Sequence, residues 1–105
     1  NNYKCFIMLV RIVKMSFDPS KIDLFLANFE LVKNQIRNFN GCNFLELYRE
    51  KNDSNIFFTY SYWDNEIALN NYRNSELFEK VWAETKILFN DKPQAWSVDK
   101  IVSLA

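Results

Sequence analysis

The chain has 105 residues, and its 13 basic and 13 acidic side chains balance to a formal net charge of zero. This balance argues against nucleic acid or an anionic membrane as a partner, because phosphate binding needs a local surplus of positive charge. Histidine is absent, which excludes a Ser-His-Asp triad, a Cys-His pair, a His-bearing zinc site and the usual proximal ligand of haem. An all-carboxylate metal site stays open, although no DxDxDG-type loop is present.

A chain of this length is typical of one domain, and we expect a single domain over residues 1–105. The apolar run at residues 5–10 is too short for a membrane span or for a signal-peptide core with its flanks. We therefore expect a cytoplasmic protein. Cys5 and Cys42 stand alone in the sequence, and we interpret both as buried small hydrophobic side chains.

The first predicted element is a strand at about residues 7–16, which is rich in β-branched side chains. Alternation along this strand places Arg11 and Lys14 on opposite faces. Met8 opens the strand, so residues 1–7 are interpreted as either an upstream extension or a remnant of processing.

A helix is predicted next, between Asp18 and Gly41. Asp18 is a suitable N-cap, and Pro19 suits the first helical position. Gly41 is the only glycine of the chain, and we expect it to end the helix in the left-handed conformation that glycine adopts at little cost. Apolar residues at spacings of three and four give the helix one buried stripe: Ile22, Phe25, Leu26, Phe29, Val32 and Ile36.

Two strands, at 42–50 and 56–63, are predicted to form an antiparallel hairpin across the turn sequence KNDSN. Asp64 is then expected to cap a short helix at 65–73, and Ser75 a longer one at 76–89. Pro93 lies beyond the helix end, and residues 94–104 read as a fourth strand.

The order β-α-β-β-α-β predicts an α+β, ferredoxin-like fold with two helices on one face of a four-stranded antiparallel sheet. The strand at 56–63 carries aromatic rings on both faces, whereas a half-solvated sheet has one polar face. An open aromatic face would exceed the few hundred Å² of apolar patch usual on monomers. We therefore predict a homodimer in which a second subunit covers the face opposite the helices.

Four segments of the sequence carry a resemblance to a known family. They are VRIVKM at 10–15, NFNGCNFLELYRE at 38–50, FFTYSYWDNEIALNNY at 57–72 and SELF at 75–78. Together they resemble the antibiotic biosynthesis monooxygenase (ABM) domain over almost the whole chain, from about residue 8 to about residue 101. The resemblance implies a dimeric α+β barrel. Known members include cofactor-independent quinol monooxygenases, haem-degrading monooxygenases and a signal-molecule isomerase.

The resemblance also suggests roles for particular residues. Trp63 stands where the family's tryptophan ends the third strand and faces a pocket between sheet and helices, and Tyr72 stands where many members carry a pocket histidine. Arg11 best matches a first-strand asparagine of the haem-degrading members, and Thr59 a strand asparagine of some quinol monooxygenases. The missing imidazole argues against the haem-degrading and isomerase branches.

A cofactor-independent monooxygenase needs a dry apolar pocket, ring-stacking walls and donors that stabilise the substrate anion. We predict such a pocket for an aromatic, quinol-like molecule, with no metal or other cofactor. Its catalytic residues would be Trp63, Tyr72 and Arg11, and its substrate-binding residues Thr59, Phe78, Trp82 and Arg73. Either arginine would hold the anion, and Tyr72 or Tyr60 would relay the proton.

Structural interpretations of the same residues stay open. The three rings at 63, 78 and 82 suit a core, and Tyr72 suits a hydrogen bond to a neighbouring carbonyl. Arg11 suits an ion pair with Glu46, across the sheet or in the dimer, and Arg73 suits a surface position beside Glu76. The alternative function is a non-catalytic, dimeric small-molecule-binding or stress-response module on the same fold.

Overall fold

The computed structural model describes residues 8–105, so the predictions for residues 1–7 and for Cys5 lie outside the described residues. The described chain confirms the predicted order of elements, with the shorter predicted helix between the third strand and the last helix. The elements are β1 (Leu9–Ser16), the 3-10 turn η2 (Pro19–Lys21), α1 (Ile22–Arg37), β2 (Cys42–Arg49), β3 (Ile56–Trp63), α2 (Glu66–Arg73), α3 (Glu76–Lys86) and β4 (Gln94–Asp99).

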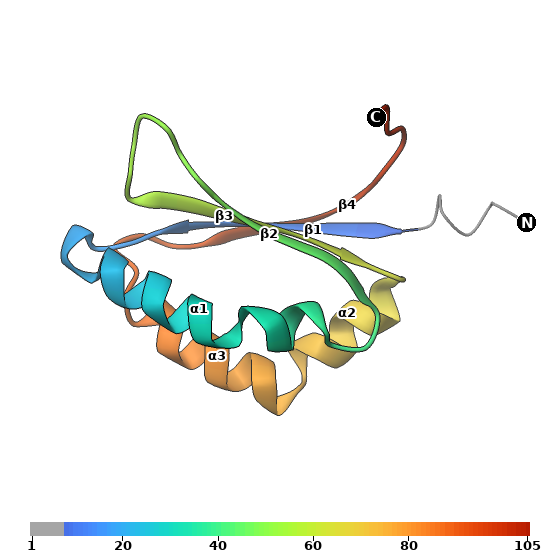
Figure 1. Ribbon diagram of the computed structural model, residues 1–105, viewed down its shortest axis with the longest axis horizontal. Helices are drawn as coiled ribbons and strands as arrows, with labels where there is room; N and C mark the ends of the chain where they lie inside the picture. Colours follow the sequence, from blue (N-terminus) through green and yellow to red (C-terminus); the bar gives the residue numbers. More distant parts are fainter. Residues whose placement is uncertain (1–7) are drawn as a thin grey trace, which may run out of the picture.

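The four strands form one antiparallel sheet in the order β2-β3-β1-β4. Figure 1 shows this sheet edge-on, with α1, α2 and α3 on one side. The β2–β3 hairpin and the C-terminal segment both rise on the other side. No helix within residues 8–105 is long and apolar enough to cross a membrane.

Gly41 adopts the predicted positive-φ conformation, with φ of 91°. It does not end the helix as predicted, because α1 ends at Arg37 with Asn38 as its C-cap, and Gly41 lies in the connection to β2. A second reason for glycine comes from α2, because a Cβ atom on residue 41 would stand 2.5 Å from the Cβ of Ala68. The backbone nitrogen of Asp64 also donates a hydrogen bond to the Gly41 carbonyl, at 2.9 Å. Gly41 therefore holds the start of β2, the end of β3 and α2 close together.

The predicted cap at Ser75 is confirmed, whereas Asp18 caps the 3-10 turn η2 before α1 and the N-cap of α1 itself is Lys21, which makes no side-chain cap hydrogen bond. The Asp18 side chain accepts a hydrogen bond from the backbone nitrogen of Ser20, at 2.9 Å, and Ser75 Oγ caps α3 by accepting from the nitrogen of Phe78, at 3.1 Å. Asn65, not Asp64, caps α2 by accepting from Ala68 N. The predicted cap at Asp64 was wrong because that carboxylate accepts a hydrogen bond from the Asn43 side chain instead.

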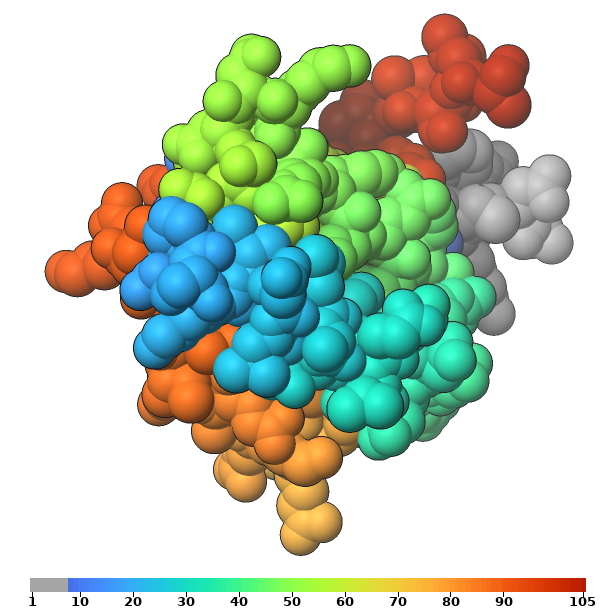
Figure 2. All heavy atoms as spheres, turned by 60° about the vertical axis from the view of Figure 1, so that its left-hand side comes forward, coloured from blue at the N-terminus to red at the C-terminus, as the bar shows by residue number. Residues whose placement is uncertain are grey.

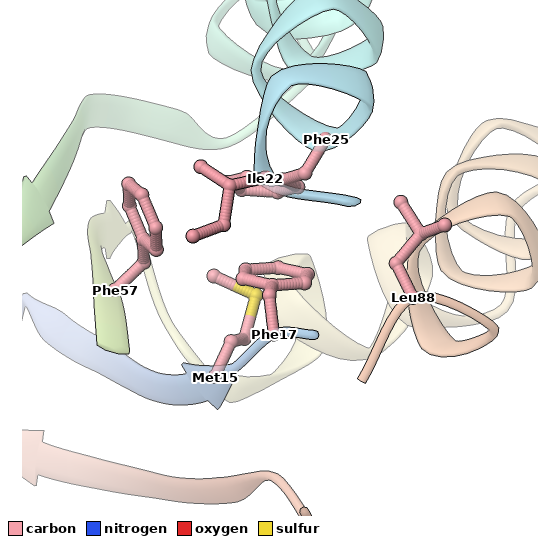
Figure 3. Packing of buried hydrophobic residues seen from close by; sticks show 6 residues of the cluster. All are labelled: Met15, Phe17, Ile22, Phe25, Phe57 and Leu88. Atoms are coloured by element: carbon pink, nitrogen blue, oxygen red, sulfur yellow. The ribbon is translucent and has the colours of Figure 1, made fainter. Parts of the chain in front are cut away.

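The helices pack on the sheet through two apolar clusters. The first gathers six buried residues, which Figure 3 shows converging from β1, β3, α1 and the segment after α3: Met15, Phe17, Ile22, Phe25, Phe57 and Leu88. The second lies towards α2 and consists of Val32, Ile36, Cys42, Trp63, Leu69 and Tyr72. Cys42 is buried and free, as expected for a small hydrophobic side chain. Figure 2 shows α1 crossing the middle of one side of the molecule, with α3 beside it.

Two predicted elements are shorter than expected. The last helix ends at Lys86 rather than residue 89, although Leu88 is still buried and Phe89 forms a β-bridge with Phe17. The last strand ends at Asp99 rather than residue 104, and all its residues are exposed. Asp99 pairs with Leu9, the first residue of β1, so β4 ends where its partner strand begins and the β-propensity of residues 100–104 does not extend it.

Candidate functional site

A cavity of about 310 Å³ lies between the helix-facing side of the sheet and the helices. Its wall includes every side chain that was predicted for the site: Arg11, Thr59, Trp63, Tyr72, Arg73, Phe78 and Trp82. The cavity also reaches Pro93, Gln94 and Ala95 at the exposed strand β4. The structure thus brings together residues from β1, β3, α2 and α3 that are up to 71 positions apart in the sequence, between Arg11 and Trp82.

Trp63 forms a fixed part of the wall. It is 1% exposed, and its Nε1 donates a hydrogen bond to Ser61 Oγ at 2.9 Å. Because that nitrogen is the only hydrogen-bond donor of the indole ring, Trp63 offers a ligand its ring surface and no donor. Ser61 was not among the predicted site residues, although the alternation of β3 places it on the same face as Trp63.

Tyr72 of α2 stacks on Trp63, with 5.0 Å between ring centroids and 25° between ring planes. Phe78 packs edge-on against Tyr72 at 5.2 Å. Burial raises the pKa of the Tyr72 hydroxyl, and the nearby Cys42 raises it further. Tyr72 therefore stays neutral at physiological pH. It can donate a hydrogen bond, but it is poorly suited to accept a proton as tyrosinate.

The second predicted proton relay, Tyr60, does not line the cavity. It pairs with Ile12 of β1 and packs against Tyr48 on the open face of the sheet, at 5.1 Å between ring centroids. The relay at Tyr60 was therefore wrong for this cavity, because alternation along β3 points residues 60 and 61 to opposite faces.

The aromatic wall continues along α3. Trp82 lies parallel to Phe78, with 5.9 Å between centroids and 9° between ring planes. Trp82 also packs edge-on against Phe89, at 5.6 Å. Flat rings in nearly parallel orientation present broad apolar surfaces, which suit the faces of a planar ligand.

Two guanidinium groups supply the charge of the cavity. Arg11 is half-buried, and its Nη1 donates a hydrogen bond to Ser97 Oγ of β4, at 3.0 Å. Burial lowers the pKa of Arg11, and the positive charge of Arg73 lowers it further. Arg73 itself is exposed at the end of α2.

The ion pairs considered for these arginines are not formed within the subunit. Glu46 pairs with Tyr60 on the open face of the sheet, whereas Arg11 lines the cavity on the helix-facing side, so a pair across the sheet was wrong. The Glu46 carboxylate instead accepts a hydrogen bond from the Tyr48 hydroxyl. Arg73 and Glu76 are both exposed, as expected, yet among residues 8–105 the only ion pair is Glu30–Lys33.

Several residues of the wall were not predicted. Thr85 is buried, and its Oγ1 donates to the Val81 carbonyl at 2.6 Å, which leaves its methyl group to the cavity. Gln94 and Ala95 of β4 enter the wall because β4 pairs with β1. Their place depends on strand pairing between distant segments, which has no local signal in the sequence.

The wall is poor in groups that bind metals or accept protons. Its titratable side chains are Arg11, Tyr72 and Arg73, and within residues 8–105 no three Cys, Asp or Glu side chains gather to hold a metal ion. Haem does not fit these residues either, because imidazole is absent from the sequence and burial disfavours the tyrosinate form of Tyr72. The arrangement can enclose an aromatic molecule, exclude water and stabilise negative charge.

Comparison with known proteins shows a match to the family model for antibiotic biosynthesis monooxygenase over residues 8–84. No curated protein matches the sequence. Among solved structures, a conserved protein from Methanosarcina mazei Go1 is 15% identical with a TM-score of 0.88, covering 95% of this chain and 99% of that one.

Two other solved structures also combine low sequence identity with a high TM-score. A structure named antibiotic biosynthesis monooxygenase is 18% identical, with a TM-score of 0.83 and coverage of 90% of this chain and 99% of that one. Rv0793 from Mycobacterium tuberculosis is 16% identical, with a TM-score of 0.84 and coverage of 93% and 99%. At these identities the likeness to solved structures shows the fold.

Proposed function

Because this chain belongs to the antibiotic biosynthesis monooxygenase family, matching its model over residues 8–84, we propose that it is a homodimeric monooxygenase that oxidises an aromatic, quinol-like small molecule without a metal or flavin. The observation that carries this proposal is the cavity of about 310 Å³, whose wall combines six aromatic rings with two guanidinium groups. A pocket of this size and lining suits a small planar molecule.

In the proposed reaction an electron-rich hydroquinone or anthrone first loses a proton. The resulting anion gives one electron to O₂, and the substrate radical and superoxide then combine to form a carbon–oxygen bond. The hydroperoxide that follows loses water and leaves a carbonyl oxygen on the ring. The protein contributes a dry pocket and a stabilised substrate anion, which is the charged species that precedes electron transfer.

Arg11 and Arg73 stabilise that anion. A guanidinium keeps its charge at all physiological pH values, so two of them beside the substrate oxygen lower the pKa of the substrate itself. The wall contains no carboxylate or imidazole, and the proton therefore leaves to water. Tyr72, kept neutral by burial, serves as a stacking wall on Trp63 and as a hydrogen-bond donor.

The missing proton acceptor also favours the second candidate function, a dimeric binding module that holds the same class of molecule without turnover. A base matched to neutral pH is the usual requirement for proton removal. Oxygen uptake separates the two candidates, because binding alone consumes no O₂.

The test is oxygen uptake by the purified protein with menadiol or anthrone. We expect uptake above the spontaneous rate, and a loss of about 10-fold or more in Trp63→Phe and Tyr72→Phe, whose rings stack in the wall. Leu31→Ala is the control, because Leu31 is 78% exposed on α1 and lines no part of the cavity. Oxygen uptake at the spontaneous rate contradicts the monooxygenase, and so does uptake by both variants at the wild-type rate. Saturable quenching of tryptophan fluorescence without oxygen uptake supports the binding module.

The proposed dimer is supported by the face of the sheet opposite the helices. Phe44 stacks on Tyr62 there, with 4.2 Å between ring centroids, while Tyr48 and Trp96 are 44% and 43% exposed. The β2–β3 hairpin and the C-terminal segment rise on this side and flank the face (Figure 1). Contiguous exposed rings on this scale are typical of an interface.

The oligomeric state is measured by sedimentation equilibrium at micromolar concentration. We expect a dimer, and we expect Tyr62→Asp to shift the protein towards monomer by placing a charge in the interface. The matched control is Leu31→Asp on α1, which adds the same single negative charge at a 78% exposed position outside this face. A stable monomer in the wild-type protein contradicts the dimer.

A further inference from the structure

The cavity holds an unusual excess of positive charge for a protein without net charge. Arg11 and Arg73 both line it, and no acidic side chain does. The guanidinium of Arg73 lies near enough to lower the pKa of Arg11. Two like charges that share a partly buried space repel each other, and within residues 8–105 neither arginine forms an ion pair that would offset this repulsion.

The groups around Arg11 do not neutralise it. Ser97 accepts one hydrogen bond from Nη1, but a guanidinium has five N–H donors, so most of its donors stay unused by that contact. Asp99 lies on the same face of β4, two residues beyond Ser97. No ion pair joins Asp99 and Arg11 in the part of the chain that the structure describes.

The position of the two charges relative to the rings is set by the fold. Arg11 stands opposite Ser61 of β3, two residues before Trp63 on the same face of the sheet. Arg73 follows Tyr72 directly, and Tyr72 stacks on Trp63. The cationic part of the wall is therefore next to the stacked rings.

We propose that the cavity takes an aromatic ligand that carries a carboxylate, whose ring lies along the Trp63–Tyr72 and Phe78–Trp82 stacks while Arg11 and Arg73 hold the carboxylate. This inference rests on the proposed function for the idea that an aromatic molecule enters the cavity, and it deepens it by naming a substrate with a permanent negative charge. A carboxylate between two guanidinium groups forms charge-assisted hydrogen bonds. Such bonds are stronger where water is excluded.

The structure also indicates why both arginines are needed. Arg11 comes from the middle of the sheet and is held by Ser97, so it supplies a fixed donor. Arg73 is exposed at the C-terminal end of α2 and supplies the second positive charge from the helix side of the cavity. The ligand charge relieves the repulsion between the two, so a neutral ligand of the same shape leaves that cost in place.

The experiment compares two unreactive probes that share ring and shape, 2-naphthoate and naphthalene-2-carboxamide, by calorimetric titration of the full chain. We expect the wild-type protein to bind 2-naphthoate about 10-fold or more tightly than the carboxamide. Arg11→Gln and Arg73→Gln are each expected to reduce this ratio to about 3 or less. Lys80→Gln is the matched control for loss of one positive charge, because Lys80 is exposed on α3 and lines no part of the cavity.

A ratio near one in the wild-type protein, no measurable binding of 2-naphthoate, or a ratio unchanged in both arginine variants overturns the inference. Arg73→Gln keeps the test valid if Arg11→Gln fails to fold, because Arg73 is at the surface. The probes do not react with O₂, so the outcome is independent of turnover. Tighter binding of 2-naphthoate without O₂ uptake in the presence of menadiol supports the inference and contradicts the monooxygenase. O₂ uptake together with an affinity ratio near one supports the monooxygenase and contradicts the inference.

Discussion

Two apolar clusters share the helix-covered side of the sheet, and they border the cavity to different extents. Four residues of the cluster around Trp63 line it (Ile36, Trp63, Leu69 and Tyr72), but only Met15 and Phe25 of the cluster around Phe17 do. In the cluster around Phe17, the Phe17 ring is fully buried, and its centroid lies 4.1 Å from the ring centroid of Phe25 and 5.7 Å from that of Phe57. In the cluster around Trp63, both aromatic rings, Trp63 and Tyr72, border the cavity of about 310 Å³, whereas Phe17 and Phe57 of the first cluster do not. Both clusters have the same kind of aromatic composition, so composition alone does not decide which one closes.

The difference lies in the sheet positions between the rings. On β1 and β3 the first cluster has the apolar pair Met15 and Phe57 facing each other. Towards Trp63 the corresponding pairs are Val13 with Thr59 and Arg11 with Ser61. An inward-facing arginine cannot be buried tightly against apolar helices without a partner, so the layer stays open around it. An inward polar pair on a helix-covered sheet is therefore a marker of a cavity.

The strongest test of this comparison replaces one ring in each cluster. Phe17→Ala is expected to lower the free energy of unfolding by about 3–5 kcal/mol, because it leaves a void in a closed core. Phe78→Ala is expected to cost about 2 kcal/mol, because that ring already borders open space and loses fewer contacts. Urea denaturation at one fixed protein concentration measures both, and equal costs would show that the second cluster is as tightly packed as the first.

Gly41→Ala tests how the open cluster is positioned, since Gly41 packs against α2, which carries Tyr72. We expect a cost of roughly 2–4 kcal/mol from the positive φ of 91° and from the contact of the new Cβ with Ala68. The ligand affinity of the cavity should fall as well, because α2 has to shift.

A double-mutant cycle with Ala68→Gly separates these two costs. Removing the Cβ of Ala68 relieves the contact at 2.5 Å but leaves the backbone strain at residue 41. We therefore expect Gly41→Ala to cost about 1–2 kcal/mol less in the Ala68→Gly background. The same cost in both backgrounds would mean that the close approach of α2 is unimportant.

Much of this fold is visible in the sequence, because its signals are local. The stripe of α1, the cap at Ser75, the Asp18 cap of the turn before α1 and the positive φ of Gly41 all act within a few residues, and the structure shows each of them. The predicted end of the helix at Gly41 was wrong, because α1 ends at Arg37. The cap at Asp64 was wrong because two neighbouring residues, Asp64 and Asn65, are both good caps. The choice between them depends on Asn43, which is distant in the sequence.

The candidate site is predictable only in part, for the same reason. The family resemblance indicates four of the seven predicted residues, Arg11, Thr59, Trp63 and Tyr72. The need for ring walls and a second cation suggests the other three, and the structure places all seven around one cavity. The contributions of Gln94, Ala95 and Ser97 depend on the pairing of β4 with β1, which no local pattern encodes. The roles of these residues in catalysis stay predictions until turnover is measured.

The smallest expected effect concerns pH, and it also separates the two clusters, since only the open one contains a buried titratable ring. Burial raises the pKa of Tyr72 above its ordinary value of 10.0. Above about pH 10 the unfolded chain therefore releases this proton while the folded chain retains it. The stability due to the neutral hydroxyl is fully present below pH 10 and is lost as pH rises towards the folded pKa.

Tyr72→Phe removes this dependence. We expect the wild-type protein to lose about 1 kcal/mol more stability than Tyr72→Phe between pH 9 and pH 11, since one pKa unit corresponds to about 1.4 kcal/mol. Both proteins are compared in the Cys42→Ala background, because burial also raises the pKa of Cys42 and its charge acts on Tyr72. The measurement is the urea midpoint at each pH. Parallel loss of stability in the two proteins would mean that the Tyr72 hydroxyl is well solvated in the cavity, and the wall beside Trp63 would then be wet rather than dry.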